Sequence, residues 1–208
     1  MNKKIGLFFG SFNPIHIGHL IIADYIVEHS DLKELWFVVS PCNPLKKKQS
    51  LLNDLQRLYM VNLAVEDDSR FRSCDIEFKL PQPSYTVNTL LRLAEKYPDK
   101  EFCLIMGEDN LDCIEKWYNY QYILDNYQIY VYPRDNYRTE NKRNLPNIHY
   151  INAPKMEISA TMIRQNIQEK KSVRYLMTEK VAKYVEDMGL YRGQGSGARG
   201  QGSVIRGQ

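Results

Sequence analysis

Residues 8–20 read Phe8-Phe9-Gly10-Ser11-Phe12-Asn13-Pro14-Ile15-His16-Ile17-Gly18-His19-Leu20. The apolar run 5–9 at the start of this stretch predicts a buried strand. Glycine, serine, asparagine and proline then break the run, as is typical of a turn. Helical spacing of apolar residues resumes after Gly18. The stretch therefore predicts a strand, a loop of small residues and a helix, in that order.

This order of elements favours an anion at the loop. Gly10 and Gly18 lie where the backbone can approach a ligand closely, and His16 and His19 lie at the mouth of the predicted helix. The N–H groups and the dipole at a helix N-terminus favour an anion such as phosphate. A sharp turn with two surface histidines is the alternative, since a glycine-rich loop alone is a weak signal.

The full strings of residues are more specific. Residues 10–19 resemble the G-x-F-[DN]-P-x-H-x-G-H signature of the nucleotidyltransferase superfamily, and residues 158–164 resemble its second signature, I-S-[ST]-T-x-I-R. Residues 83–90, residues 106–111 with Trp117, and the ending Gly189-Leu190-Tyr191 resemble the bacterial nicotinate mononucleotide adenylyltransferases. The resemblance extends from Lys3 to about Arg192. The chain departs from the usual family pattern at three positions, Ser11, Asn13 and Ala160.

Length, charge and cysteine content exclude several classes of protein. The 208 residues suit one domain, 1–192, with a C-terminal helical part at about 156–192. The formal charge of +3 falls to +1 without Arg199 and Arg206 (3 minus 2), which argues against a nucleic-acid partner. No apolar run is long enough for a membrane span or a signal peptide. Four cysteines without metal-binding spacing predict reduced thiols in a cytoplasmic protein.

Strands and helices alternate along the predicted domain. Strands are expected at 5–9, 35–39, 70–78 (at the sheet edge), 102–106, 127–132 and 148–151. Helices are expected after Gly18 and at 54–66, 86–97, 159–167 and 179–188, with a short helical piece that ends at 117–118. This alternation predicts an α/β fold, a parallel sheet with helices on both faces, and the resemblance implies its Rossmann-like doubly wound form. Residues 133–146 are expected to form an exposed loop, a candidate lid. Residues 193–208 are expected to be a disordered tail, a candidate cloning extension.

The resemblance implies transfer of adenylate from ATP to the phosphate of nicotinate mononucleotide, which releases pyrophosphate. The attacking group is already an anion, so the reaction needs positioning and charge neutralisation rather than a serine or cysteine nucleophile. Mg²⁺ is expected to arrive with ATP, held by phosphate oxygens and water, because the sequence contains no dedicated carboxylate cage. We therefore predict no metal site made by the protein.

The predicted ATP contacts come from both signatures. The resemblance implies that His16, His19 and Arg164 are catalytic, with His19 nearest the α-phosphate. The complete predicted set is Gly10, Ser11, Phe12, His16, Gly18, His19, Ser159, Thr161 and Arg164. A guanidinium fork suits phosphate oxygens better than a lysine does. The alternative for Ser159 is a plain helix cap.

The predicted mononucleotide contacts are Phe12, Asn13, Lys46, Tyr85, Thr86, Asp109 and Trp117. Trp117 would stack on the pyridine ring, or else belong to the core, and Asp109 would bind a ribose or cap a helix. Lys46, in a lysine run after two prolines, would contact phosphate or lie in a solvated loop. Arg57 would face the site or form a surface salt bridge.

A preference for the acid over the amide is also expected. Ser84 is the predicted N-cap of the helix at 86–97, so the N–H groups of Tyr85 and Thr86 precede any intrahelical acceptor. A carboxylate on the pyridine ring offers these donors acceptors only, whereas an amide also presents its own N–H groups.

Three alternatives stay open. Pantetheine-phosphate adenylyltransferases share the first signature, but their chains are usually shorter and lack the pieces at 84–90 and Trp117. Class I aminoacyl-tRNA synthetases carry the string found at 16–19, yet they are far longer, and residues 155–159 only partly match their KMSKS motif. The third alternative is a non-catalytic nucleotide sensor. The sequence leaves the oligomeric state open, a homo-oligomer included.

Overall fold

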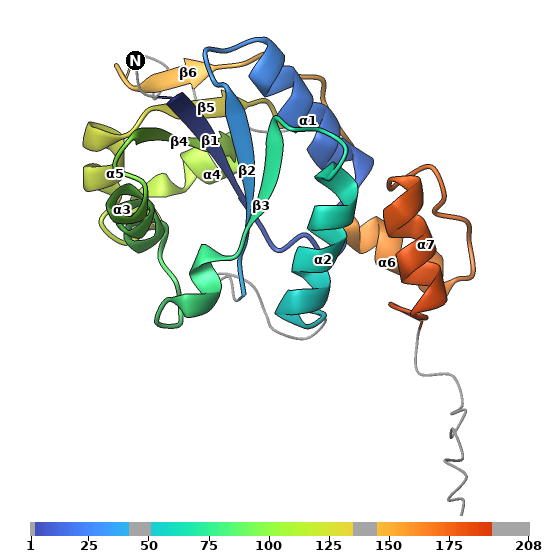
Figure 1. The fold of residues 1–208 in the computed structure, drawn as a ribbon. Helices are drawn as coiled ribbons and strands as arrows, with labels where there is room; N and C mark the ends of the chain where they lie inside the picture. The colour runs from blue at the N-terminus through green and yellow to red at the C-terminus, as the bar shows by residue number, and fades with distance from the viewer. Residues whose placement is uncertain (1–2, 42–50, 135–144, 193–208) are drawn as a thin grey trace, which may run out of the picture.

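The computed structural model describes residues 3–41, 51–134 and 145–192. Six parallel strands form one sheet in the order β3-β2-β1-β4-β5-β6 (Figure 1). The strands are β1 (Lys3–Gly10), β2 (Glu34–Val39), β3 (Phe71–Cys74), β4 (Lys100–Gly107), β5 (Ile129–Tyr132) and β6 (Ile148–Tyr150). This order is that of the doubly wound Rossmann fold, as the alternation of elements predicts.

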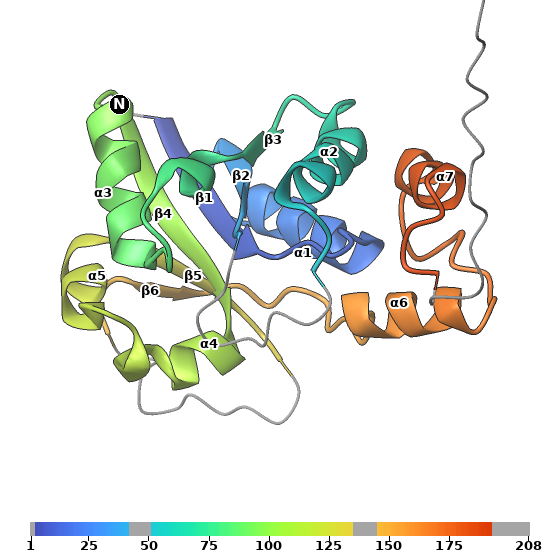
Figure 2. The ribbon, with the colours of Figure 1, turned by 90° about the horizontal axis from the view of Figure 1, so that it is seen from below.

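Helices cover both faces of the sheet, and Figure 2 shows α3 on the side opposite α1 and α2. The α-helices are α1 (Ile17–Glu28), α2 (Asp54–Val65), α3 (Thr86–Lys96), α4 (Glu108–Asp112), α5 (Tyr120–Asn126), α6 (Ala160–Gln168) and α7 (Glu179–Asp187). Two short 3₁₀ turns complete the described elements, η1 (Ile76–Lys79) and η2 (Ile114–Lys116). The last two helices lie beyond α1 and α2 rather than on the sheet (Figures 1 and 2).

The alternating side chains of the strands divide the core into two apolar layers. On β1, Phe8 packs into the layer that contains residues of α1, α2 and α7, whereas Ile5 and Leu7 pack into the layer beneath α3, α4 and α5. Strands buried on both faces read as nearly continuous apolar runs, which is why the strand positions could be predicted.

Three local predictions differ from the structure. The edge strand predicted at 70–78 stops at Cys74 and continues as η1. Helix α5, just before β5, was absent from the prediction. Ser84 does not cap α3: Tyr85 is the N-cap residue, and the Ser84 hydroxyl donates instead to Glu77 Oε2 at 2.9 Å. The buried carboxyl group of Glu77, in the preceding 3₁₀ turn, thus competes successfully for the capping hydroxyl.

The strand order reverses between β1 and β4, which lie side by side and continue to β2 and β5 on their outer sides. In open parallel sheets, ligands bind beyond the carboxyl ends of the strands at such a reversal. The loop after β1 carries His16, and the segments after β4 and β5 begin with Glu108 and Pro133. The topology therefore places these three segments at the same end of the sheet.

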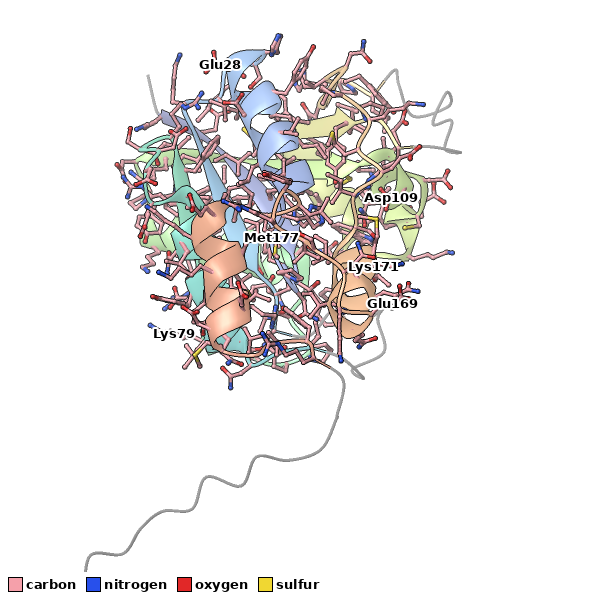
Figure 3. The ribbon with its side chains drawn as sticks, turned by 90° about the vertical axis from the view of Figure 1, so that its right-hand side faces the viewer. Glu28, Lys79, Asp109, Glu169, Lys171 and Met177 are labelled. Carbon is pink, nitrogen blue, oxygen red and sulfur yellow. The ribbon has the colours of Figure 1, made fainter. Side chains whose placement is uncertain are left out.

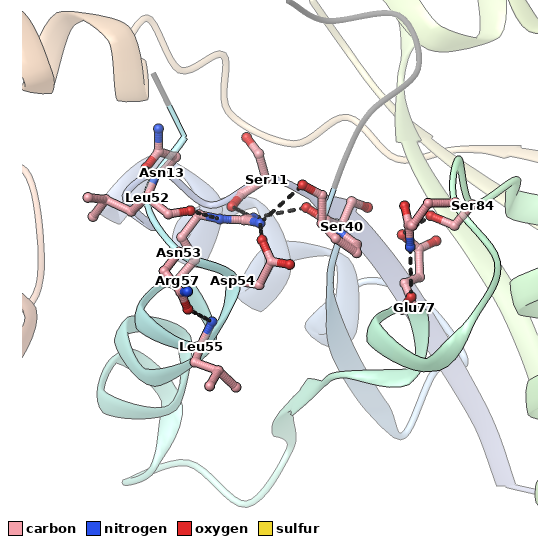
Figure 4. A network of polar contacts seen from close by, with 12 residues as sticks. Ser11, Asn13, Ser40, Leu52, Asn53, Asp54, Leu55, Arg57, Glu77 and Ser84 are labelled. Carbon is pink, nitrogen blue, oxygen red and sulfur yellow. Dashed lines mark hydrogen bonds and ion pairs between the residues drawn. The ribbon is translucent and has the colours of Figure 1, made fainter. Parts of the chain in front are cut away.

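A buried arginine joins the segments on one side of this end. The Arg57 side chain has no exposed surface, and it binds the carbonyl oxygens of Ser11 (2.5 Å), Ser40 (2.9 Å) and Leu52 (3.1 Å) (Figure 4). Its Nη2 also lies 2.6 Å from Asp54 Oδ1. Arg57 thus ties the loop after β1 to the end of β2 and to the start of α2. Arg57 does form a salt bridge, the alternative considered from the sequence, but its guanidinium is buried rather than at the surface.

The buried carboxyl group of Glu77 joins another set of segments by hydrogen bonds. Glu77, which is 3 % exposed, accepts hydrogen bonds from Ser84 Oγ (2.9 Å) and Thr89 Oγ1 (2.8 Å), and it also pairs with the Ser40 hydroxyl (Figure 4). Burial raises the pKa of Glu77 above its ordinary value, and the three hydroxyl groups oppose this rise. Glu77 therefore connects the end of β2 with the first turns of α3.

Helices α6 and α7 attach to the rest of the fold through apolar contacts. Met177, between the two helices in Figure 3, is 3 % exposed and belongs to the core layer that contains Phe8. The backbone N–H of Ile17, the first residue of α1, donates to the carbonyl of Leu176 at 3.0 Å. None of the helices in the described part of the chain has the length and apolar character needed to cross a bilayer.

We predict that Arg57→Met lowers the free energy of unfolding by at least about 3 kcal/mol, because several buried carbonyl groups then lose their donor at roughly 1–3 kcal/mol each. Urea unfolding measures the change. Arg92→Met is the control, since Arg92 is exposed and pairs only with Glu95 in the described structure; its effect should stay within about 0.5 kcal/mol. Equal effects in the two variants would contradict the role of Arg57.

We also predict that Glu77 makes stability pH-dependent. Because its folded-state pKa is raised above 4.5, the unfolded chain loses the proton first as pH rises. The stability contributed by Glu77 is therefore complete below pH 4.5 and declines above it. Relative to the wild type, Glu77→Gln should become progressively more stable as pH increases from 4.5 to neutrality, measured by urea unfolding. Exposed Glu95→Gln is the control, and a constant difference for Glu77→Gln would contradict this assignment.

Candidate functional site

Two stacked histidines stand at the mouth of α1. The rings of His16 and His19 lie 3.7 Å apart with an angle of 26° between their planes. His16 is the residue before the helix, and its backbone N–H donates to His19 Nδ1 at 3.3 Å. The His19 ring meets Phe12 edge-on at 5.1 Å and Phe8 at 6.0 Å. Aromatic packing from β1 and the loop therefore fixes the direction of both imidazoles.

Burial keeps His16 uncharged. Its side chain is 6 % exposed, and burial, assisted by the nearby charge of Arg134, lowers its pKa to about 4. His16 is thus a neutral imidazole at pH 7, able to donate one hydrogen bond without contributing a charge.

Gly18 packs against this ring: a Cβ at that position would lie 3.1 Å from His16 Nδ1 and 3.5 Å from the Cβ of Met156. Met156 therefore borders the histidine pair.

A pocket of about 500 Å³ opens beside the histidines. Its walls come from the start of α4, the end of β5 and the segment that leads into α6. The lining residues are Asp109, Pro133, Arg134, Lys155, Met156, Glu157, Ile158 and Ser159. In Figure 3, Asp109 lies above α6, near the chain that leads into this helix. The structure therefore brings Asp109, a predicted mononucleotide contact, and Ser159, a predicted ATP contact, into one pocket.

Arg134 supplies positive charge to this pocket. Its backbone N–H donates to Glu108 Oε2 at 3.1 Å, and its guanidinium lies over the Tyr132 ring at 5.4 Å. Its Nε lies 3.9 Å from Asp109 Oδ1, and neither atom has a hydrogen-bond partner within the described structure. In the sequence, Arg134 falls within the exposed loop expected at 133–146. Its place directly after β5, at the carboxyl end of the sheet, is the signal that was missed.

The second signature forms the N-terminus of α6. Ser159 caps the helix, as predicted, because its hydroxyl oxygen accepts the N–H of Met162 at 3.2 Å. Arg164, one turn further on, donates from Nη1 to the carbonyl oxygen of Asn13 at 2.8 Å and from Nη2 to Thr161 Oγ1 at 3.2 Å. The two signatures therefore touch, although 151 residues separate Asn13 from Arg164.

Packing of Phe12 and hydrogen bonds of Asn13 hold the loop after β1 in place. Phe12 is 2 % exposed and has a left-handed backbone with φ 44°, and a Cβ at Gly10 would lie 2.7 Å from its ring. Glycine at position 10 therefore permits the chain to fold over the phenylalanine. Asn13, also 2 % exposed, accepts the N–H of Leu52 at 3.3 Å and the hydroxyl of Tyr191 at 2.9 Å through Oδ1. Asn13 thus contacts two other parts of the chain.

The predicted mononucleotide residues of α3 and Trp117 lie in neighbouring segments. The rings of Tyr85 and Tyr118, the residue after Trp117, are 4.9 Å apart. Trp117 is partly buried against the core layer beneath α3, and its Nε1 has no hydrogen-bond partner in the described chain. Trp117 can therefore both pack against the core and stack on a ligand ring, because its side chain is only partly buried.

Other predicted features lie elsewhere. Lys46, most of the 133–146 loop and the tail 193–208 fall outside the described residues. Among residues 3–41, 51–134 and 145–192, no cluster of three or more histidine, cysteine, aspartate or glutamate side chains could hold a metal ion. The cysteines in these ranges, at 74, 103 and 113, are free thiols.

Comparison with known proteins finds relatives by sequence and a common architecture by structure. A profile of the cytidylyltransferase-like family matches residues 7–166. A protein of Flavobacterium psychrophilum named "Probable nicotinate-nucleotide adenylyltransferase" is 58% identical over 191 residues, which cover 91% of this chain and 99% of that protein. A protein of the same name from Bacteroides thetaiotaomicron is 47% identical over 185 residues, 88% of this chain and 91% of its own.

The structure of Plasmodium falciparum nicotinic acid mononucleotide adenylyltransferase, complexed with NaAD, superposes with a TM-score of 0.77 and 21% identity. The superposition covers 91% of this chain and 97% of that one, so the architecture is common to nearly the whole domain. The chain therefore belongs to the cytidylyltransferase-like family and, within it, to the nicotinate-nucleotide adenylyltransferases.

Proposed function

We propose that this protein transfers the adenylyl group of ATP to nicotinate mononucleotide, which forms nicotinate adenine dinucleotide and pyrophosphate. The observation that carries the proposal is the stacked pair of His16 and His19 at the mouth of α1, beside a pocket whose wall continues to the N-terminus of α6. Two helix N-termini and cationic side chains at one end of a parallel sheet suit a polyphosphate. The relatives over nearly the whole chain support the same substrates.

The reaction is a displacement at phosphorus. A phosphate oxygen of the mononucleotide attacks the α-phosphorus of ATP, the bond from that phosphorus to the bridging oxygen breaks, and pyrophosphate leaves with the electron pair. No covalent intermediate with the protein is needed, because the nucleophile is already anionic. The protein contributes positioning and stabilisation of the charge that develops on the transferring and leaving groups.

His16 and His19 act in this proposal as hydrogen-bond donors to the phosphates of ATP. His16 is neutral at pH 7 because its pKa is about 4, so its contribution is a directed N–H rather than a charge. Positive charge comes from arginines: Arg164 at α6, as the sequence predicts, and Arg134 after β5, which we add to the predicted ATP site. Both arginines already make hydrogen bonds within the protein, which hold their side chains in place.

Mg²⁺ enters as part of the substrate, chelated by the triphosphate. The described acidic side chains do not form a cluster that could hold the ion, and the preference of Mg²⁺ for phosphate oxygens and water is consistent with delivery on ATP. Asp109, which lines the pocket, is the carboxylate we assign to a ribose hydroxyl. We keep the cytoplasm as the proposed location, which the free thiols support.

We assign the pyridine ring to the neighbourhood of Trp117 and Tyr85. Its carboxylate would then meet the N–H groups of Tyr85 and Thr86 at the start of α3, ahead of the first intrahelical acceptors. Tyr85, rather than Ser84, is the N-cap residue, and Thr86 is the first residue of the helix, so both N–H groups still precede the intrahelical hydrogen bonds.

The direct test is pyrophosphate release from ATP and Mg²⁺ with nicotinate mononucleotide, with 4′-phosphopantetheine and without an acceptor. Pyrophosphate release is expected only in the mixture that contains nicotinate mononucleotide. Release with phosphopantetheine would instead favour the related adenylyltransferases that use this acceptor. ATP binding without release in any mixture would favour a nucleotide sensor.

We predict that His19→Ala lowers kcat by about 10²–10³, the range for removal of one preorganised donor to a transition state, while cooperative unfolding is retained. Steady-state kinetics and thermal unfolding check both parts. His29→Ala is the matched control, since His29 is an exposed residue at the far end of α1. A kcat close to that of the wild type would remove His19 from the catalytic set.

We predict that kcat/KM for nicotinate mononucleotide exceeds that for the amide by at least about tenfold. An unpaired donor at the start of α3 costs about 1–3 kcal/mol, and the helix dipole adds about 0.3–1 kcal/mol for the anion. Both mononucleotides are compared at the same concentrations of ATP and Mg²⁺. A ratio near one, or a preference for the amide, would mean that the ring substituent does not meet this helix end.

A further inference from the structure

We propose that Tyr191, in the last described residues of the chain, is a positioning residue for the loop that carries His16 and for Arg164, and that it acts through Asn13. This inference rests on the proposed function, because it assigns a role within the same site. Its evidence is a set of contacts that converge on one buried amide.

Asn13 is the point at which three distant parts of the chain meet. Its Oδ1 accepts the Tyr191 hydroxyl at 2.9 Å and the N–H of Leu52 at 3.3 Å, and its carbonyl oxygen accepts Arg164 Nη1 at 2.8 Å. Asn13 itself is 2 % exposed. These bonds hold Asn13 in place, and they thereby direct the residues that follow it, up to His16.

The end of α7 is shaped so that Tyr191 reaches this amide. Gly189 adopts a left-handed backbone with φ 59°, and the N–H groups of Gly189 and Leu190 donate to the carbonyls of Glu186 and Val185, both at 3.0 Å. This pattern is a Schellman motif, which reverses the chain after a helix. Tyr191 then also adopts a left-handed backbone, φ 62°. Two departures from extended or helical backbone, at Gly189 and Tyr191 on either side of Leu190, thus direct the phenol back to the first loop.

The phenol lies among the groups that organise the site. Burial raises the pKa of Tyr191 well above its usual range, and the charges of Arg164 and Arg57 oppose this rise because both guanidiniums are nearby. The hydroxyl therefore keeps its proton and remains a donor to Asn13 throughout the working pH range. Loss of this donor would free the side-chain amide of Asn13 to turn. Because the backbone carbonyl of Asn13 holds Arg164, the position of Arg164 would then be less well fixed.

The consequence should be seen with ATP, since Arg164 is the proposed ATP contact. We expect Tyr191→Phe, which removes one oxygen atom and keeps the ring, to lower kcat/KM for ATP by about three- to tenfold, the range for loss of one hydrogen bond. Tyr175→Phe is the control, because Tyr175 is 85% exposed and lies outside the site.

A mutant cycle separates positioning from a general loss of packing. If Tyr191 acts through Asn13, Tyr191→Phe should have no further effect in an Asn13→Ala background, where the acceptor is absent. It should keep its effect in an Asn13→Asp background, because a carboxylate also accepts the hydroxyl. Equal effects in all three backgrounds, or unchanged kinetics in the single variant, would overturn the inference.

Binding of ATP with Mg²⁺, measured by calorimetry on the same variants, provides a second readout that needs no turnover. The same dependence on Asn13 is expected for Kd as for kcat/KM. If the wild-type protein binds ATP but makes no dinucleotide, the proposed function fails, and the calorimetric cycle still decides the role of Tyr191. A Kd that Tyr191→Phe leaves unchanged, alongside unchanged kinetics, refutes it.

Discussion

The structure depends on one buried cation. Arg57 lies beneath the carboxyl end of the sheet without contact to water, and its guanidinium satisfies carbonyl groups from the first loop, the end of β2 and the approach to α2. Loop backbones at this end have no sheet partners, and a buried carbonyl without a donor is costly. The guanidinium carries five N–H donors, so a single side chain can satisfy several of these carbonyl groups at once. Arg57 thereby stabilises the segment that carries His16 and His19.

Much of the fold could be predicted because the strands are buried on both faces and read as short apolar runs, and because glycine, serine, asparagine and proline mark the turn in the first signature. The misses at Arg57, Glu77 and Ser84 have a common cause. Each of these side chains bonds to a partner in another element or loop, and the local pattern of residues carries no information about such a partner. Ser84 has the residue type of a helix cap, but a buried carboxyl group claims its hydroxyl. Arg134 looked like one basic residue among several in a polar loop, and only the sheet order identifies its position as special.

Different residues of the site direct hydrogen bonds and carry positive charge. The stacked imidazoles of buried His16 and partly exposed His19 present N–H groups whose orientation is fixed by Phe8, Phe12 and each other, while the arginines after β5 and in α6 carry positive charge. A neutral His16 has less water to lose than an imidazolium would, so it can remain buried before the nucleotide arrives. This division explains how two histidines can stack at 3.7 Å without the repulsion expected between two cations.

The contact between Arg164 and Asn13 also bears on the order in which the protein is made. The six strands end at Tyr150, so on a ribosome the sheet and its first loop emerge before α6 and α7, and domains generally begin to fold from the N-terminus. Arg164 and Tyr191 follow the last strand in the sequence and so leave the ribosome after the whole sheet. A nascent chain can therefore possess its sheet while it still lacks the guanidinium and the phenol that contact Asn13, and the proposed ATP site is complete only once α6 and α7 have emerged.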